Sequence, residues 1–266
     1  MRALSAADLP RAGALSALVG WNQNGADWRF FLDHGATRAL DDGDPDCLAA
    51  TAAVLPFGGE IAWISMVLVR PDRRREGLAT DLMRWAIGAA PRAALDATPA
   101  GREVYRRLGF EDVFGFTRWR LDGVPAAPAR GVRPLREADW PTLLERDARA
   151  FGASRGSLLR DFARRLPAAA WIAEDGSFAL GRDGLRLPQI GPVVARDAGT
   201  ALALIAASRA AIGPCLLDLH DEAAAIAAAL DSAQGERLRP FTRMTRGTAL
   251  PGDTTALFAM AGPEFG

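Results

Sequence analysis

The stretch IAWISMVLVRPDRRREGLATDLMRWAI, residues 61–87, decides the fold. Its first part is a near-continuous apolar run, which is typical of a strand covered on both faces, and we expect that strand over residues 60–69. An arginine-rich turn with one glycine follows, and the apolar spacing from residue 80 onward predicts an amphipathic helix. Such a loop gathers backbone N–H groups at a helix N-terminus, where an anion such as a pyrophosphate can bind.

The flanking segments predict a mixed α/β unit around this stretch. The first expected helix begins at Asp8 and ends at about Val19. A polar loop over residues 20–28 follows and leads to a second expected helical stretch, which ends at His34. Further strands are expected at 37–40, 47–57, 94–98 and 112–121, with a helix at 99–108. The fold class is therefore α/β, with a central mixed sheet flanked by helices.

The same pattern returns about 125 residues later in the chain. Four segments match in order: RALSAADLP (2–10) with RPLREADWP (133–141), VLVR (67–70) with VVAR (193–196), ALDAT (94–98) with LLDLH (216–220), and GFTRW (115–119) with PFTRM (240–244). We therefore expect two tandem copies of one fold, at 1–122 and 132–266, joined by a Pro/Ala/Gly-rich linker at 123–131.

The charged residues exclude several functions. The chain has 32 arginines, no lysine, and 32 acidic residues, so its net charge is zero and its composition implies no basic surface for nucleic acid. Without lysine there can be no Schiff base and no P-loop. The two cysteines have no metal-ligand spacing, and no apolar run is long enough to span a membrane. The N-terminus lacks the unbroken apolar run of a signal peptide, so we expect a cytoplasmic protein.

Two motifs carry a resemblance to a known family. Residues 74–79, RREGLA, fit the pattern Arg/Gln-x-x-Gly-x-Gly/Ala directly after the apolar strand, and residues 105–110, YRRLGF, fit Tyr-x-x-x-Gly-Phe at the end of a helix. The chain thus resembles the GNAT acetyltransferase superfamily. The segments GWNQ, DW and AWISMVLV and the ending FAMAGPEFG make it similar to the tandem acetyltransferases of the YitH type, and this match covers nearly the whole chain.

The resemblance implies an N-acetyltransferase in which an amine attacks the thioester of acetyl-CoA directly. Tyr105, the single tyrosine of the chain, would protonate the departing coenzyme A thiolate, for which an O–H donor is needed. The residues implied in binding acetyl-CoA are Val67, Leu68, Val69, Arg74, Arg75, Glu76, Gly77, Leu78, Ala79 and Thr80.

The general base is not given by the resemblance, because the best-known members carry a glutamate where this chain has Trp63. Asp96 is our first candidate, since it shares a strand face with Thr98 beside the expected cleft. Glu60, Asp27, a water relay and an already neutral amine remain open. We expect a small-molecule amine as acceptor, bound near the cleft between the domains by Trp21, Asn22, Gln23, Asp27, Trp28 and His220.

The second copy lacks the loop motif and has no tyrosine, so we expect that it does not turn over acetyl-CoA. Asp218 and His220 lie on one strand face, but no third ligand accompanies them, so no metal is expected. The alternatives are transfer of a larger acyl group, an acetyltransferase for a protein amine, and a non-catalytic acyl-CoA-binding or sensing protein. Neither the acceptor's identity nor the oligomeric state follows from the sequence.

Overall fold

The computed structural model describes residues 1–58, 61–89, 92–123, 131–247 and 252–266. Its strands are β1 (Ala36–Leu40), β2 (Ala50–Phe57), β3 (Ile61–Val69), β4 (Arg92–Ala97), β5 (Glu111–Leu121), β6 (Val132–Pro134), β7 (Trp171–Ala173), β8 (Phe178–Arg182), β9 (Gln189–Val194), β10 (Cys215–His220), β11 (Glu236–Arg246) and β12 (Leu257–Ala259). Its α-helices are α1 (Leu9–Leu18), α2 (Gly25–His34), α3 (Leu78–Ile87), α4 (Pro99–Arg107), α5 (Trp140–Phe151), α6 (Gly156–Arg165), α7 (Ala198–Ile212) and α8 (Ala224–Ser232). Short 3₁₀ helices lie at Ala6–Asp8, Pro71–Arg73, Glu137–Asp139, Pro167–Ala169 and Thr254–Ala256. In the described part of the chain, no helix has both the length and the apolar character needed to cross a membrane.

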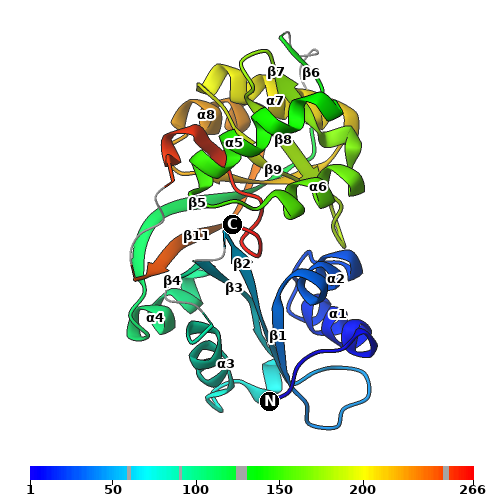
Figure 1. Cartoon of the computed structure of the whole chain (residues 1–266), viewed down its shortest axis with the longest axis vertical. Helices are drawn as coiled ribbons and strands as arrows, with labels where there is room; N and C mark the ends of the chain where they lie inside the picture. The colour runs from blue at the N-terminus through cyan, green and yellow to red at the C-terminus, as the bar shows by residue number, and fades with distance from the viewer. Residues whose placement is uncertain (59–60, 90–91, 124–130, 248–251) are drawn as a thin grey trace.

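Strand β3 is covered on both faces, which explains its continuous apolar run. Successive side chains of a strand point to opposite faces. Trp63 packs into the cluster formed with α1 and α2, while Ile64 packs into the cluster that contains Met83 of α3. The two helical layers lie on opposite sides of the sheet (Figure 1). Helix α3 begins at Leu78, two residues before its expected start.

The described strands form one sheet, and the two halves of the chain exchange a strand within it. The order is β1-β2-β3-β4-β11-β5-β10-β12-β9-β8-β7-β6. Strand β11, from the second half, pairs with β4 of the first half, and β5, from the first half, pairs with β10 of the second. The two exchanged strands pair with each other in the middle, where they form the long ribbon that joins the upper and lower parts of the molecule (Figure 1).

The repeat found in the sequence appears as matching local structure in both halves. Arg2 donates two hydrogen bonds of 2.7 Å to the carboxylate of Asp8, just before α1. Arg133 makes the same pair of 2.7 Å bonds to Asp139, just before α5. In both halves a 3₁₀ turn leads into the helix, and a proline stands in its first turn, so the match between residues 2–10 and 133–141 is structural as well.

The predicted division at 1–122 and 132–266 falls between two halves that share one continuous sheet. Each part contributes a strand beside the other part's strands, so the sheet runs through the boundary without a break. The boundaries themselves stay a prediction. Of the predicted linker, 123–131, only Gly123 and Gly131 lie within the described residues.

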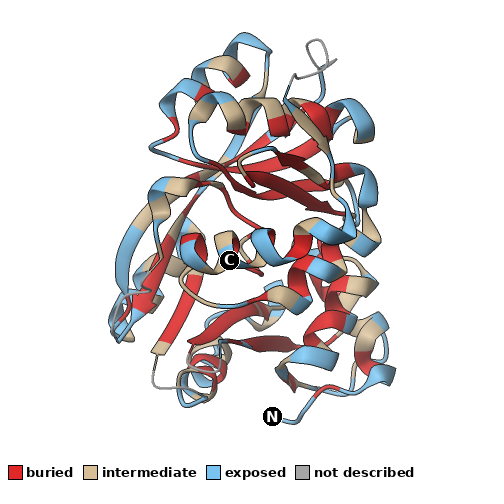
Figure 2. Cartoon of the chain, turned by 45° about the horizontal axis from the view of Figure 1, so that its top comes forward, coloured by how far each residue is buried: buried red, intermediate tan, exposed pale blue. Residues whose placement is uncertain are grey.

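The chain ends in the core between the two halves. The ring of Phe265 stacks on Phe31 of α2 at 5.0 Å and meets Phe162 of α6 edge-on at 5.3 Å. Buried residues follow the sheet and surround this C-terminal segment (Figure 2). The last residues therefore join α2 of the first half to α6 of the second.

Candidate functional site

Strands β3 and β4 diverge and open a cleft between them. Their parallel pairing runs from Ile61 to Trp63 on β3, although β3 continues to Val69 and β4 to Ala97. The register of β3 against β2 shifts just beyond this point, between Ser65 and Leu68, where Met66 has a φ of 53°. Such a bulge bends the strand locally, so the second part of β3 leans away from β4.

The β3–β4 cleft has a volume of about 710 Å³. The end of β3, the loop after it, the first turns of α3 and α4, and Arg239 of β11 line the cleft. Nine of the ten residues predicted for acetyl-CoA lie there: Val67, Leu68, Val69, Arg74, Arg75, Gly77, Leu78, Ala79 and Thr80. Glu76 is the exception, since it does not line the cleft. Its carboxylate instead accepts hydrogen bonds from Arg73.

The first turn of α3 offers an anion site at the mouth of the β3–β4 cleft. Gly77 caps this helix with a φ of 82°, a left-handed conformation that favours glycine, and no side chain caps it. The first N–H groups of a helix have no partner within the helix and carry a partial positive charge. An anion that reaches the cleft can therefore accept hydrogen bonds from this turn.

The arginines of the loop divide into paired and free side chains. Arg70 and Arg73 form ion pairs with Asp42, and each has a further carboxylate partner. Arg74 and Arg75 form no ion pair with any described residue, and both line the cleft. Two guanidinium groups are thus available to a bound anion beside the first turn of α3.

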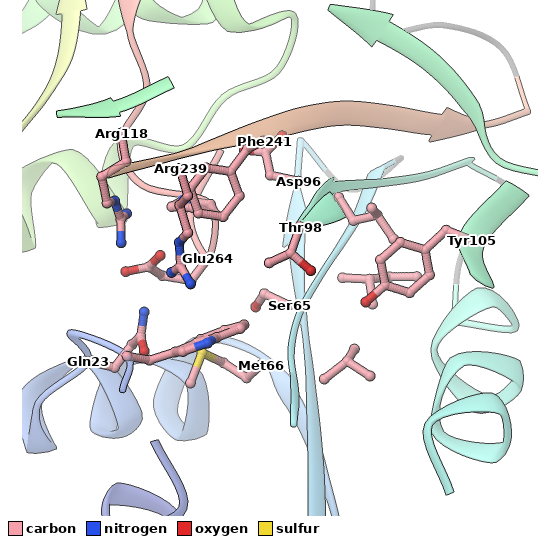
Figure 3. A pocket seen from close by; sticks show the side chains of 15 residues that line it. Gln23, Ser65, Met66, Asp96, Thr98, Tyr105, Arg118, Arg239, Phe241 and Glu264 are labelled. Atoms are coloured by element: carbon pink, nitrogen blue, oxygen red, sulfur yellow. The ribbon is translucent and has the colours of Figure 1, made fainter. Parts of the chain in front are cut away.

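Tyr105 stands at the inner end of the β3–β4 cleft. Helix α4 carries it, and Thr98 caps that helix by accepting a hydrogen bond of 3.2 Å from the N–H of Gly101. The Tyr105 hydroxyl makes no hydrogen bond to a described residue and points to the side where Thr98 and Ser65 lie (Figure 3). Burial raises the pKa of Tyr105 to about 12, so the hydroxyl stays protonated at neutral pH.

The cleft continues past Tyr105 into the contact between the two halves. An inner cavity of about 30 Å³, room for about one water molecule, is lined by side chains that include Trp21, Gln23, Ser65, Asp96, Arg118, Arg239 and Glu264. An outer cavity of about 530 Å³ shares Arg118 and Arg239 with it and reaches the surface beside Arg186 and Leu238. Figure 3 shows residues of both halves converging on the inner cavity.

Three of the six predicted acceptor residues line these cavities. Trp21 and Gln23 border the inner cavity. Asn22 borders the outer cavity, where its side chain accepts a hydrogen bond from the N–H of Arg186 and donates one to the carbonyl of Leu187. The polar loop that follows α1 thus faces the contact between the halves, and its role in binding the acceptor stays a prediction.

Asp27 and Trp28 do not line the cavities, because the expected loop over residues 20–28 ends in a helix from Gly25 onward. Asp27 is fully buried and forms ion pairs with Arg182 and Arg165 at 2.6 and 2.8 Å. Trp28 lies in the core and donates to the hydroxyl of Ser16. We therefore remove both residues from the expected acceptor site, and Asp27 from the candidate bases.

His220 also lies away from the cavities. Its ring stacks on Phe114 at 4.5 Å, its Nδ1 accepts a hydrogen bond from the N–H of Glu222, and burial lowers its pKa. Its strand neighbour Asp218 pairs with Arg118. Among the described residues, no group of three or more His, Cys, Asp and Glu side chains could hold a metal ion.

Asp96 borders the inner cavity but is occupied by an ion pair. Both of its oxygens accept hydrogen bonds of 2.9 Å from Arg243, and its side chain is fully buried. Burial raises the pKa of this carboxyl, and the charge of Arg243 opposes the rise. A carboxylate held on both oxygens by a guanidinium is poorly placed to accept a proton from a substrate, so the geometry disfavours our first candidate for the base. Glu60 lies outside the described residues.

Helix α7 of the second half corresponds to α3 of the first half, and a side chain already caps its N-terminus. Asp197 precedes α7 and accepts a hydrogen bond of 2.8 Å from the N–H of Thr200. A carboxylate of the chain itself therefore holds the position that an anion could take at α3. The start of α7 thus differs from that of α3, and the absence of acetyl-CoA turnover in the second half stays a prediction.

Several residues of the inner cavity were not predicted from the sequence, among them Arg239 and Glu264. Arg239 lies in β11, which the exchange brings beside the first half, and Glu264 lies in the C-terminal segment between the halves. The segment FAMAGPEFG contributed to the family resemblance, but nothing in its spacing assigned Glu264 a role. Only the tertiary structure brings both residues to the site.

Comparisons with known proteins agree with this architecture. Two family models described as acetyltransferase (GNAT) domain match the chain, one over residues 34–112 and the other over residues 143–259. No curated protein matches the sequence. The tandem arrangement seen in the repeat is thus matched by one family model in each half.

Several solved structures share the fold at low sequence identity. A Pyrococcus horikoshii protein provisionally described as an acetyltransferase has a TM-score of 0.83 at 18% identity, covering 100% of this chain and 95% of its own. A tandem GNAT protein from the clavulanic acid biosynthesis pathway has a TM-score of 0.61 at 16% identity, with 93% and 98% covered. A GCN5-related N-acetyltransferase from Sphaerobacter thermophilus has a TM-score of 0.61 at 18% identity, with 94% and 97% covered. These likenesses show the fold of the whole chain.

Proposed function

The chain carries two GNAT acetyltransferase domains in tandem, and from this premise we propose that its first half transfers the acetyl group of acetyl-CoA to the amine of a small molecule bound between the halves. The observation that carries the proposal is the β3–β4 cleft, with an uncapped helix N-terminus at its mouth and a free tyrosine hydroxyl at its inner end. An acyltransferase needs both features, one to hold the acyl donor and one to release its thiol.

Binding of acetyl-CoA is proposed to follow the length of the cleft. The first turn of α3 would donate N–H groups to the pyrophosphate, with Arg74 and Arg75 beside it. The pantetheine arm would lie along β3 at Val67, Leu68 and Val69, where the strand has left β4 and its backbone is open to the cleft. Backbone N–H groups at this level could also polarise the thioester carbonyl.

Tyr105 is proposed as the general acid. The amine nitrogen forms a bond to the acetyl carbon and gives up a proton to solvent. The carbon–sulfur bond breaks, and the departing sulfur takes the proton of the Tyr105 hydroxyl, which solvent then replaces. The hydroxyl suits this role because it has no partner among the described residues and its raised pKa, about 12, keeps it protonated.

The first experiment measures acetyl-CoA binding without any acceptor. Isothermal titration calorimetry is carried out on the unchanged protein, on Gly77→Glu, and on Gly13→Glu as a matched control. Both glycines have open space around them, but only Gly77 has a positive φ and lies in the cleft. We expect at least tenfold weaker binding for Gly77→Glu and no change for Gly13→Glu. Equal binding by all three proteins would refute the proposed donor site.

A further inference from the structure

Arg239 is an arginine without a partner at the meeting point of the three cavities. It lines the β3–β4 cleft, the inner cavity and the outer cavity, and its guanidinium stacks over the ring of Phe241 at 4.8 Å. It forms no hydrogen bond or ion pair with a described residue. Two other arginines of the same strand are paired, Arg237 with Asp231 and Arg243 with Asp96.

The outer cavity has an excess of positive charge. Four arginines and one glutamate line it, and the charged side chains are Arg118, Arg120, Arg186, Arg239 and Glu236. Arg118 is neutralised by Asp218 and Arg120 by Asp122. Arg186, like Arg239, has no ion-pair partner among the described residues. A ligand with a negative group would therefore be attracted to this side of the site.

The inner cavity has free hydrogen-bond acceptors on its other walls. Gln23 Oε1 and Ser65 Oγ are buried and have no hydrogen-bond partner, although their residues are only 2% and 7% exposed. One oxygen of Glu264 is held by Arg182, while the other accepts no hydrogen bond from a described residue. Figure 3 shows Gln23, Glu264 and Arg239 pointing into the same space. Buried polar atoms without partners are rare and indicate a missing ligand or water.

We propose that the acceptor is a small primary amine that also carries a carboxylate or another anionic group. The inference rests on the proposed acetyl transfer and names its substrate class. An ammonium group has three N–H donors, and the inner cavity offers Gln23 Oε1, Ser65 Oγ and the free oxygen of Glu264 to receive them. The anionic group pairs with Arg239, and the rest of the molecule extends into the outer cavity.

The same arrangement supplies the proton acceptor that Asp96 does not. The ammonium gives one proton to the carboxylate of Glu264, and the freed nitrogen lone pair forms the bond to the acetyl carbon. The carbon–sulfur bond breaks, the sulfur takes the proton of Tyr105, and solvent replaces that proton. The nitrogen loses its second proton to solvent as the amide forms. Glu264 then releases its proton to solvent through the outer cavity, so both residues return to their starting state.

The test compares matched acceptors that differ in one charge. The twenty common α-amino acids, β-alanine and 4-aminobutyrate are each assayed with acetyl-CoA beside their carboxamides, and thiol release is measured. We expect at least one acid to be acetylated with a kcat/KM at least tenfold above that of its amide. In Arg239→Gln this ratio should fall to about one, while Arg237→Gln, the control on the same strand, keeps it.

A second variant tests the proton acceptor. Glu264→Gln should lower kcat for the preferred acid at neutral pH by about a hundredfold, with part of the loss recovered at higher pH, where the amine is neutral. Acetyl-CoA binding, measured by calorimetry, should change less than twofold in Glu264→Gln and Arg239→Gln. If Glu264→Gln does not fold, the arginine variants still decide the substrate class.

The outcomes separate the inference from the proposed function. Three outcomes would overturn the inference but not the proposed acetyl transfer. They are amides acetylated as well as the acids, turnover confined to uncharged amines, and an unchanged acid-to-amide ratio in Arg239→Gln. A loss of acetyl-CoA binding in Arg239→Gln would assign this arginine to the donor and also overturn it. Failure of the unchanged protein to bind acetyl-CoA, or thiol release with no amine at all, would contradict the proposed function itself.

Discussion

Arg243 donates hydrogen bonds from Nε and Nη2 to the two oxygens of Asp96, each at 2.9 Å, and so ties the last long strand of the second half to a strand of the first. Arg118 makes the equivalent contact to Asp218, at 2.7 and 2.8 Å, in the other direction. The two arginines occupy the same place in the repeated Phe-Thr-Arg motif. The exchange of strands is therefore held by two related buried ion pairs.

Breaking one of these pairs should destabilise the whole protein. We expect Arg243→Met to lower the free energy of unfolding by about 3–5 kcal/mol, because it leaves the Asp96 carboxylate buried without its partner. The double variant with Asp96→Leu should lose less than Arg243→Met alone. Arg149→Met is the control, since Arg149 pairs with Glu145 where both side chains are 72% exposed, and it should change stability by less than about 0.5 kcal/mol. Urea unfolding of the four proteins checks this.

Removing the Tyr105 hydroxyl should slow transfer without weakening donor binding. We expect Tyr105→Phe to lower kcat by about 10²–10⁴-fold, with acetyl-CoA affinity unchanged by calorimetry. Because the pKa of Tyr105 is about 12, ionisation of this group should cause no fall in kcat below about pH 11. Turnover that Tyr105→Phe leaves intact would remove the acid assignment.

Gly101 should act as a positioning residue for Tyr105. A Cβ atom at Gly101 would lie 3.0 Å from Cε2 of the Tyr105 ring, so Gly101→Ala must displace the ring. We expect kcat to fall about tenfold or more, while the helix itself gains about 0.5–1 kcal/mol from the loss of a glycine. The control is Gly13→Ala in α1, where a Cβ meets nothing within 4 Å. A Gly101→Ala enzyme with normal kcat would show that the ring has room to move.

The ion pair before α5 should make stability depend on acid pH. The hydrogen bond from Arg133 lowers the pKa of Asp139 from its ordinary value to about 2. A lowered pKa in the folded state gives stability that is present above the ordinary value and is lost as the pH falls toward 2. Arg133→Met should therefore lower the urea midpoint at pH 7 and have much less effect at pH 2. Urea midpoints at both values measure this, and a difference independent of pH would contradict it.

The repeat and the β3–α3 unit could be predicted because local sequence determines them. An apolar run, a glycine with positive φ and an amphipathic helix lie within residues 61–87. The strand exchange could not be predicted, because β5 and β11 carry nearly the same motif and either could lie beside β4. The choice between them depends on long-range contacts rather than on side-chain pattern.

The errors at the acceptor site have a local cause. Asn24 and Asp27 form a capping box, with Asn24 accepting from the N–H of Asp27 and Asp27 from the N–H of Asn24. This spacing was present in the sequence and starts α2 at Gly25, which turns Trp28 into the core. Arg239 and Glu264 could not be found in this way, since they come from segments more than a hundred residues away from the cleft motifs in the sequence.

The exchanged strands also decide when the protein can complete its fold during synthesis. Strand β4 is translated long before its neighbour β11, which begins more than a hundred residues later in the chain. Until then β4 and β5 present unpaired backbone edges, which are the usual starting points of aggregation. The donor-binding half therefore closes its sheet only after β11 of the second half has been made.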